Sequence, residues 1–375
     1  MTKMTKKKQE KLNQIKINAL MGNDTHYTSA QNDFYEIIEI NKAFGEAAEV
    51  TQEEFYQKIY ELSNQNPCFN EALDILNLGQ QIIEMKKNKD TDNSSIKDLE
   101  LEVRQYERDN IIPTDAAAYA YYNIGILYQD LMPINQINGE KELSDSGKNV
   151  FRRALKLTSD IRLIELISDE MNISSANDLE ILRETYYRAL NNPENPDLFS
   201  TYYNCAKTYL QTPENNVKKI SYQQTNSDSS TNDEMALSYF MAALDYTDDC
   251  HDKQKVLRHI RDIQKKTSPD DSYKTSMELA DLMTGLIKAK FLCELSSEKI
   301  LTEKQQKQSL IASARHLSTP DMAPQGHKEI LWKKLEKTAK TLSFTPEETK
   351  ELQQIKKAYN KNLKPALKVS KTKNR

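Results

Sequence analysis

Few residues of this 375-residue chain have the types and spacing that catalysis or metal binding requires. Asp252, His259 and Asp262 are separated by seven and three residues, so in a helix they would share one face and could act as a metal or acid–base set. A helical metal-hydrolase motif also needs an upstream histidine and a downstream aspartate in matched helices, and neither has a counterpart. We interpret the three residues as a polar surface face, and they are the candidate site of an enzymatic alternative.

The sequence Asp90-Thr91-Asp92 has the Asp-x-Asp form that holds a metal–nucleotide sugar in many glycosyltransferases. Those sites adjoin a parallel sheet, whereas this sequence lies in a polar break between two predicted helices, so we interpret it as a solvated loop. The eight glycines are never closer than eight positions apart, which excludes dinucleotide loops, phosphate loops and nucleophile elbows. We therefore predict no catalytic residue, no metal site and no cofactor.

The elements that would position any site are predicted to be helices. Glycine (8 residues) and proline (11 residues) are scarce, and β-hairpin turns depend on such residues. Apolar residues recur at helical spacing, as at Phe55, Ile59 and Leu62, and Thr51 with Glu54 three positions later has the sequence of a capping box. No segment alternates with period two for long enough to indicate a strand. The predicted fold class is all-α.

Cysteine usage and hydropathy indicate a reducing compartment and no membrane span. The four cysteines lie far apart in the chain, which favours free thiols over a disulfide framework or a structural zinc site. No run approaches the ~18 apolar residues that a spanning helix needs, and the lysine-rich start lacks the apolar region of a secretory signal. We expect a cytoplasmic protein.

The net charge of −4 is unevenly distributed. Residues 1–16 carry +5 and residues 361–375 carry +6, so the body of the chain between them carries −15. An RNA-binding helical repeat is a third hypothesis that fits the basic ends, but a nucleic-acid groove needs a contiguous basic surface, so we expect no nucleic-acid partner. The basic ends could contact anionic surfaces weakly.

The central third of the chain contains an internal repeat. Residues Ala120–Tyr128 and Thr201–Tyr209 are 81 positions apart, and each places a small residue, Gly125 or Ala206, three positions before a tyrosine. Small residues at these positions would let two antiparallel helices pack closely. Each segment is followed by a second helix with one small–aromatic–alanine spacing: Gly147, Phe151 and Ala154; Ala236, Phe240 and Ala243. A third copy with the same spacing, Leu182, Tyr186 and Ala189, lies between them.

This pattern resembles the tetratricopeptide repeat (TPR) family, with the Sel1-like repeats as a near neighbour, over about residues 117–247. The resemblance implies an α-solenoid of antiparallel helical hairpins that binds a protein or peptide. Two copies carry loop insertions at about 131–145 and 211–233, and Asp169 and Glu170 replace the small pair in the middle copy. Antiparallel helical hairpins outside the family can show the same spacing, and this remains the alternative.

In this family the first helices line a concave groove. The resemblance implies that the following residues point into it: Tyr122, Asn123, Ile126, Gln129, Tyr203, Asn204, Lys207 and Gln211. Asn123 and Asn204 match a position whose amide often binds a peptide backbone, and a packing role is the alternative for both. Tyr122 and Ile126 stand where a clamp for a partner's C-terminal carboxylate would have Lys and Asn, so a chaperone-tail receptor is not expected.

The flanks are predicted to extend the stack as helical N- and C-terminal extensions. The expected organisation is an N-terminal helical region 1–112 with 1–30 flexible, TPR-like repeats 113–250, a C-terminal helical region 251–363 and a basic disordered tail 364–375. Within the C-terminal region, 251–266 and 272–295 are expected to form one helical pair.

A second resemblance concerns Pro346–Glu351, which is similar to the acidic block near the end of type IV secretion effectors of intracellular bacteria. The alternative is an ordinary helix start, with Thr345 as N-cap and acids in the first turn. The expected function is a protein-interaction scaffold or adaptor without catalysis. The runner-up is a bacterial effector, secreted into a host cytosol without a classical signal peptide, that carries an all-helical enzymatic site.

Overall fold

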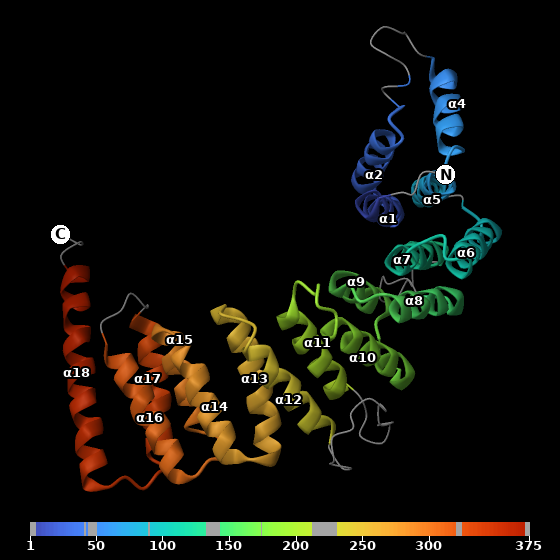
Figure 1. Ribbon diagram of the computed structural model, residues 1–375. Coiled ribbons are helices and arrows are strands. Elements are labelled where there is room, and N and C mark those ends of the chain that lie inside the picture. The colour runs from blue at the N-terminus through green and yellow to red at the C-terminus, as the bar shows by residue number, and fades with distance from the viewer. Residues whose placement is uncertain are drawn as a thin grey trace. The chain divides into compact units, whose positions relative to one another are not determined.

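Helices are the only regular elements in the described part of the computed structural model (Figure 1), so the predicted all-α class is confirmed. The structure describes residues 5–40, 43, 51–88, 91–132, 143–173, 175–211, 231–319 and 325–371. Residues 133–142 and 212–230, most of the two expected loop insertions, lie outside this part. The chain divides into two compact units, Met1–Asn226 (unit 1) and Ser227–Arg375 (unit 2).

The helices of unit 1 are α1 (Lys6–Leu20), α2 (Asp24–Ile37), α4 (Gln52–Ser63), α5 (Pro67–Lys87), α6 (Asn93–Arg108), α7 (Thr114–Asp130), α8 (Asp145–Leu157), α9 (Ile161–Met171), α10 (Ala176–Leu190) and α11 (Leu198–Gln211). The helices of unit 2 are α12 (Asn232–Leu244), α13 (Cys250–Thr267), α14 (Pro269–Asp281), α15 (Gly285–Leu295), α16 (Glu303–Ser318), α17 (Gln325–Ala339) and α18 (Pro346–Lys371).

Short-range signals start several of these helices. Thr51 and Glu54 form the predicted capping box at α4, in which each side chain binds the other residue's backbone N–H. The start of α18 has the same arrangement: the Thr345 N–H donates to Glu348 Oε2 (2.8 Å) and the Glu348 N–H donates to Thr345 Oγ1 (3.2 Å). This part of the acidic sequence Pro346–Glu351 therefore serves a helix N-terminus.

The N-terminal residues, expected to be flexible up to residue 30, instead form α1 and α2 and pack into unit 1. Leu12, Ile15 and Leu20 of α1 are fully buried because the helix packs against α2, α5 and α7 at once. The Lys16 ammonium, also buried, donates to the Ile111 carbonyl (2.6 Å) and to Glu71 (3.0 Å). These three residues stand at positions i, i+3 and i+8 and so form an apolar stripe on one face of the helix, which the surrounding lysines made difficult to recognise in the sequence.

Close packing of α7 on α8 occurs at the small residue expected there. A Cβ atom on Gly125 would lie 2.5 Å from the ring of Phe151, so only glycine permits this approach. The other small and aromatic residues of the repeated second helices are also buried, including Ala154 in α8, Tyr186 in α10 and Phe240 in α12. In unit 1, α8 packs against α9 and α10, and α10 packs against α11.

Unit 2 differs from expectation in two places. Residues 272–295, expected as one helix, are divided into α14 and α15, and Gly285 at the break has a positive φ of 52° that favours glycine. The second difference is the length of α18, which continues to Lys371, so residues 364–371 of the expected tail are helical. Residues 372–375 lie outside the described part of the chain.

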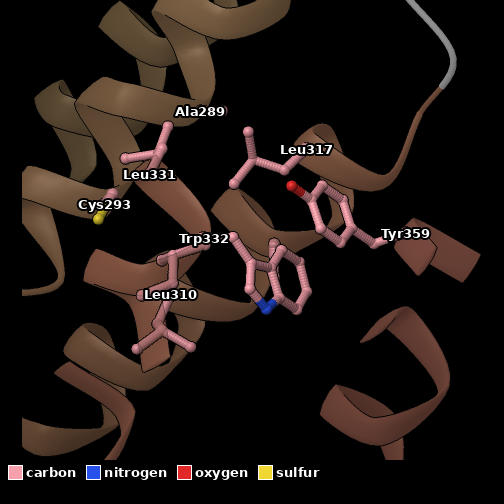
Figure 2. Close-up of a cluster of buried hydrophobic side chains, with 9 residues drawn as sticks. Ala289, Cys293, Leu310, Leu317, Leu331, Trp332 and Tyr359 are labelled. Atoms are coloured by element: carbon pink, nitrogen blue, oxygen red, sulfur yellow. The ribbon is translucent and has the colours of Figure 1, made fainter. Parts of the chain in front are cut away.

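The core at the end of unit 2 contains side chains from all four of the helices α15, α16, α17 and α18 (Figure 2). Ala289, Leu310, Leu317 and Trp332 are buried there, and the Trp332 ring stacks on the Tyr359 ring with centroids 4.4 Å apart and planes 9° apart. Both α17 and α18 pack against α16. The stacked pair therefore fixes α18 to α17 across the surface of α16.

Candidate partner-binding face

One side of α7 presents half of the expected site. Tyr122, Ile126 and Gln129 are separated by four and three residues, and all three are half-buried while most of the remaining helix is buried. The Tyr122 ring contacts the Phe151 ring with centroids 5.9 Å apart. Burial, and then the negative charge of Glu170, raises the pKa of the Tyr122 hydroxyl. The hydroxyl thus stays a neutral hydrogen-bonding group beside a carboxylate.

Asn123 does not belong to this face. It is fully buried, and its amide nitrogen donates to the carbonyls of Leu20 and Tyr119, at 2.9 Å each. Its amide oxygen accepts from the Lys86 ammonium (3.0 Å). These bonds satisfy the Asn123 amide within the protein, because the end of α1 packs against α7. The packing alternative therefore holds for Asn123, and its expected position in the groove is wrong.

The second half of the expected site lies on α11. Tyr203, Asn204 and Lys207 are half-buried and Gln211, the last residue of the helix, is exposed. The Lys207 ammonium lies 5.7 Å from the centroid of the Tyr203 ring, within the range of a cation–π contact. The Tyr203 ring also stacks on the Phe199 ring, with centroids 5.9 Å apart.

Helix α9 contacts both α7 and α11, the two helices that carry the expected site residues. No residue of α9 was among those predicted for the site. The negative charge of its Glu170 raises the pKa of the Tyr122 hydroxyl, and its Glu165 accepts a hydrogen bond from the amide of Asn204 (2.8 Å). Burial raises the pKa of the Glu165 carboxyl, and Asp197 raises it further, while Asn204 and Lys207 act in the opposite direction. The only sequence signal was the pair of acids that replaces small residues in the middle copy.

Carboxylates also gather at the starts of α7 and α9, next to this face. The Tyr119 hydroxyl of α7 donates to Asp160 (2.6 Å), the N-cap residue of α9, and so ties the two helices together. Burial raises the pKa of the Asp115 carboxyl, with contributions from Asp160 and Glu194. We name the combined surface of α7, α9 and α11 the tyrosine–acid face: Tyr122, Ile126, Gln129, Glu165, Glu170, Tyr203, Asn204, Lys207 and Gln211.

The enzymatic alternative on α13 is not supported by the positions of its residues. His259 stacks on the Phe240 ring at 4.8 Å, and Asp252 pairs with Lys255 at 3.2 Å. Within the described residues no three His, Cys, Asp or Glu side chains are grouped so that they could hold a metal ion. Asp92 of the Asp-x-Asp sequence is the N-cap of α6, where it accepts from the Ser95 N–H (2.7 Å), and Asp90 lies outside the described residues.

Comparisons of this chain with protein-family models, with curated proteins and with solved structures found no match. Among the described helices none is long and apolar enough to cross a membrane. The functional assignment therefore depends on the geometry of the tyrosine–acid face.

Proposed function

We propose that unit 1 is a protein-interaction module that binds a positively charged peptide segment of a partner along the tyrosine–acid face. In this proposal α7, α9 and α11 are the first helices of a short TPR-like α-solenoid, and α8 and α10 are second helices behind them. The observation that carries the proposal is that α9 bonds to both neighbouring helices: Asp160 at its N-cap accepts from Tyr119 of α7, and Glu165 accepts from Asn204 of α11.

Two features support a peptide as the occupant. Half-buried tyrosines offer a large contact area and a hydroxyl at a small cost in side-chain entropy. Tyr122 and Tyr203 supply these rings on two of the helices. Gln129 and Gln211 lie further along the same helices and add amides that can bind a peptide backbone.

The charge of the face supports a basic occupant. Glu165 and Glu170 lie on α9 between the tyrosines, and Asp160 and Asp197 flank them. Lys207 opposes them, but its ammonium is directed to a tyrosine ring. Arginine and lysine side chains of a partner would meet both carboxylates and aromatic faces here, and opposite charges accelerate association at low salt.

The test is affinity capture from a cell lysate, analysed by mass spectrometry, with the unmodified chain and a Tyr122→Ala/Tyr203→Ala variant. The matched control is Tyr56→Ala/Tyr60→Ala, which removes two exposed tyrosines from α4, away from the face. Circular dichroism confirms that each variant keeps its helix content. We expect the partner to be lost by the face variant and kept by the control.

A second variant tests the charge. Glu165→Gln/Glu170→Gln should weaken binding of the captured partner and reduce the salt dependence of its affinity. Equal capture by the face variant and the control would place the binding site elsewhere. A partner whose bound segment is acidic, or capture of no specific partner, would contradict the proposal.

A further inference from the structure

In unit 2, residues of α16, of α17 and of α18 line an open pocket of about 460 Å³. Its apolar lining includes Leu310 and Ala314 of α16, Leu335 of α17 and Leu352 of α18. Pockets of 300–1,000 Å³ with mainly apolar walls are typical of small-molecule sites. The pocket exists because both α17 and α18 pack on α16, which leaves a space between them.

Two aromatic residues contribute to the lining of the pocket. Phe344 lies in the connection between α17 and α18. Trp332 lies on α17, and its ring stacks on the Tyr359 ring of α18 (Figure 2). Trp332 and Ala339 are seven residues apart on α17, and Lys340 follows directly after this helix, so the pocket extends for about 10 Å along α17. That length suits one short alkyl chain.

The rim of the pocket carries an excess of positive charge. Glu336 accepts from the Trp332 indole N–H (3.0 Å) and from the Lys356 ammonium (2.5 Å), so its charge is compensated. These two bonds lower the pKa of the Glu336 carboxyl, with Lys356 as the larger cause. Lys340, an exposed residue at the rim, forms no hydrogen bond or ion pair among the described residues, and its charge also lowers the pKa of the Glu336 carboxyl.

We propose that this pocket binds a medium-chain alkyl carboxylate, with the chain between Leu335 and Leu352 and the carboxylate at the Lys340 ammonium. Thr349 and Gln353 lie on the same rim, and their side chains provide hydroxyl and amide groups for the carboxylate. The apolar walls discriminate against water-soluble anions such as acetate. The unpaired lysine discriminates against neutral and cationic chains of the same length.

The chain contains a single tryptophan, and Trp332 lines the pocket, so tryptophan fluorescence reports on this site alone. The experiment is a titration of the full chain with decanoate below its micelle concentration, with decanol and decylamine as matched ligands. We expect a saturable change in the Trp332 emission with decanoate. Decanol should bind about tenfold more weakly or less, because it lacks the charge-assisted bond to Lys340.

Three variants complete the test. Lys340→Met should weaken decanoate binding about tenfold while leaving decanol binding unchanged, because it removes the charge and keeps the apolar stem. Lys337→Met is the control, since Lys337 is exposed on the same helix but does not line the pocket. Ala339→Phe places a ring in the pocket and should abolish binding of both ligands.

Several outcomes would overturn the proposal. Unchanged Trp332 emission with decanoate would exclude the ligand class, and equal affinity for decanoate, decanol and decylamine would exclude a role for Lys340. Binding that survives Ala339→Phe would show that decanoate associates elsewhere. Analytical ultracentrifugation of the ligand-free chain measures its oligomeric state. A dimer that is dissociated by Ala339→Phe would assign the pocket to an interface between two copies of this chain.

Discussion

The amide oxygen of Asn123 lies 2.2 Å from the position that a Cβ atom on Gly22 would occupy. Gly22 has a positive φ of 73° and follows the end of α1, and its carbonyl accepts from the Lys86 ammonium (3.0 Å), which also binds Asn123. One glycine, one amide and one lysine thus join the α1–α2 turn to α5 and α7. Both the conformation and the space at this turn require glycine.

Gly22→Ala should destabilise unit 1 by about 2 kcal/mol or more, because a side chain is strained at this φ and collides with Asn123. Thermal unfolding followed by far-UV circular dichroism measures the effect. The control is Gly326→Ala in α17, where no atom lies within 4 Å of the new Cβ and the melting temperature should be unchanged or higher. Equal effects of the two substitutions would contradict the packing described here.

Two buried tyrosines should respond oppositely to replacement by phenylalanine. The Tyr121 hydroxyl donates to Glu107 (2.6 Å), whereas the buried Tyr359 hydroxyl has no hydrogen-bond partner among the residues that the structure describes. Tyr121→Phe should cost about 1 kcal/mol, and Tyr359→Phe should be neutral or stabilise by about 1 kcal/mol. Chemical denaturation of both variants, with the Trp332 fluorescence following unit 2, tests the contrast. A loss of stability in Tyr359→Phe would show that its hydroxyl is satisfied.

The ionisation of Tyr35 should be displaced to high pH. Burial is the main cause that raises the pKa of Tyr35 to about 12, and Tyr56 and Tyr27 contribute. A raised pKa means that the folded state holds this proton more tightly, so the stabilisation is complete below pH 10 and is lost as the pH rises through about 12. The matched variant is Phe55→Ala, which removes the ring packed at 5.4 Å and should lower the Tyr35 pKa towards 10 in an ultraviolet titration.

The ion pair between α8 and α10 should contribute measurably to stability. Arg152 donates to both carboxylate oxygens of Asp178 (2.6 and 3.2 Å), and Ser175 also donates to Asp178 (2.6 Å). A double-mutant cycle with Arg152→Met and Asp178→Asn should give a coupling of about 1–2 kcal/mol. The exposed pair Lys274–Asp271 is the control, and no coupling should be detected there.

The same pair predicts a loss of stability in acid. Burial opposes ionisation of Asp178, but the bonds from Arg152 and Ser175 outweigh it, so the pKa of this carboxyl lies below its usual 3.8. The stabilisation is therefore present above about pH 4 and is lost as the pH falls through the lowered pKa. Asp178→Asn should show a shallower decline of stability in this range, and identical pH profiles for the two proteins would contradict the assignment.

Local sequence signals made the helices predictable. The burial of individual site residues was not predictable where it depends on contacts between distant parts of the chain. Thr51 and Glu54 start α4 within four residues, and the spacing of Tyr122, Ile126 and Gln129 places them on one side of α7 without reference to any other helix. The burial of Asn123 depends on Leu20, 103 residues earlier, and no local pattern contains that information.

The sequence did not predict the pocket of unit 2 or the contacts of α9 with α7 and α11, because both depend on how distant helices pack. Trp332 and Ala339 have an ordinary amphipathic spacing on α17, and the space beside them arises only because α18 packs on α16. Glu165 was one acid among many until the structure placed it against Asn204, 39 residues further along the chain. Only the assembled helices reveal which charges face one another.

The bond between Leu20 and Asn123 has a consequence for synthesis of the chain. Its two residues are 103 positions apart, and α1 also needs Ile111, 95 positions after Lys16. At roughly 5–20 residues per second, a ribosome needs about 5–20 s to extend the chain from the first partner to the second. During that interval α2 and α5 are available to cover part of the apolar stripe of α1, but the part that α7 covers stays exposed, and the growing chain must avoid aggregation through it.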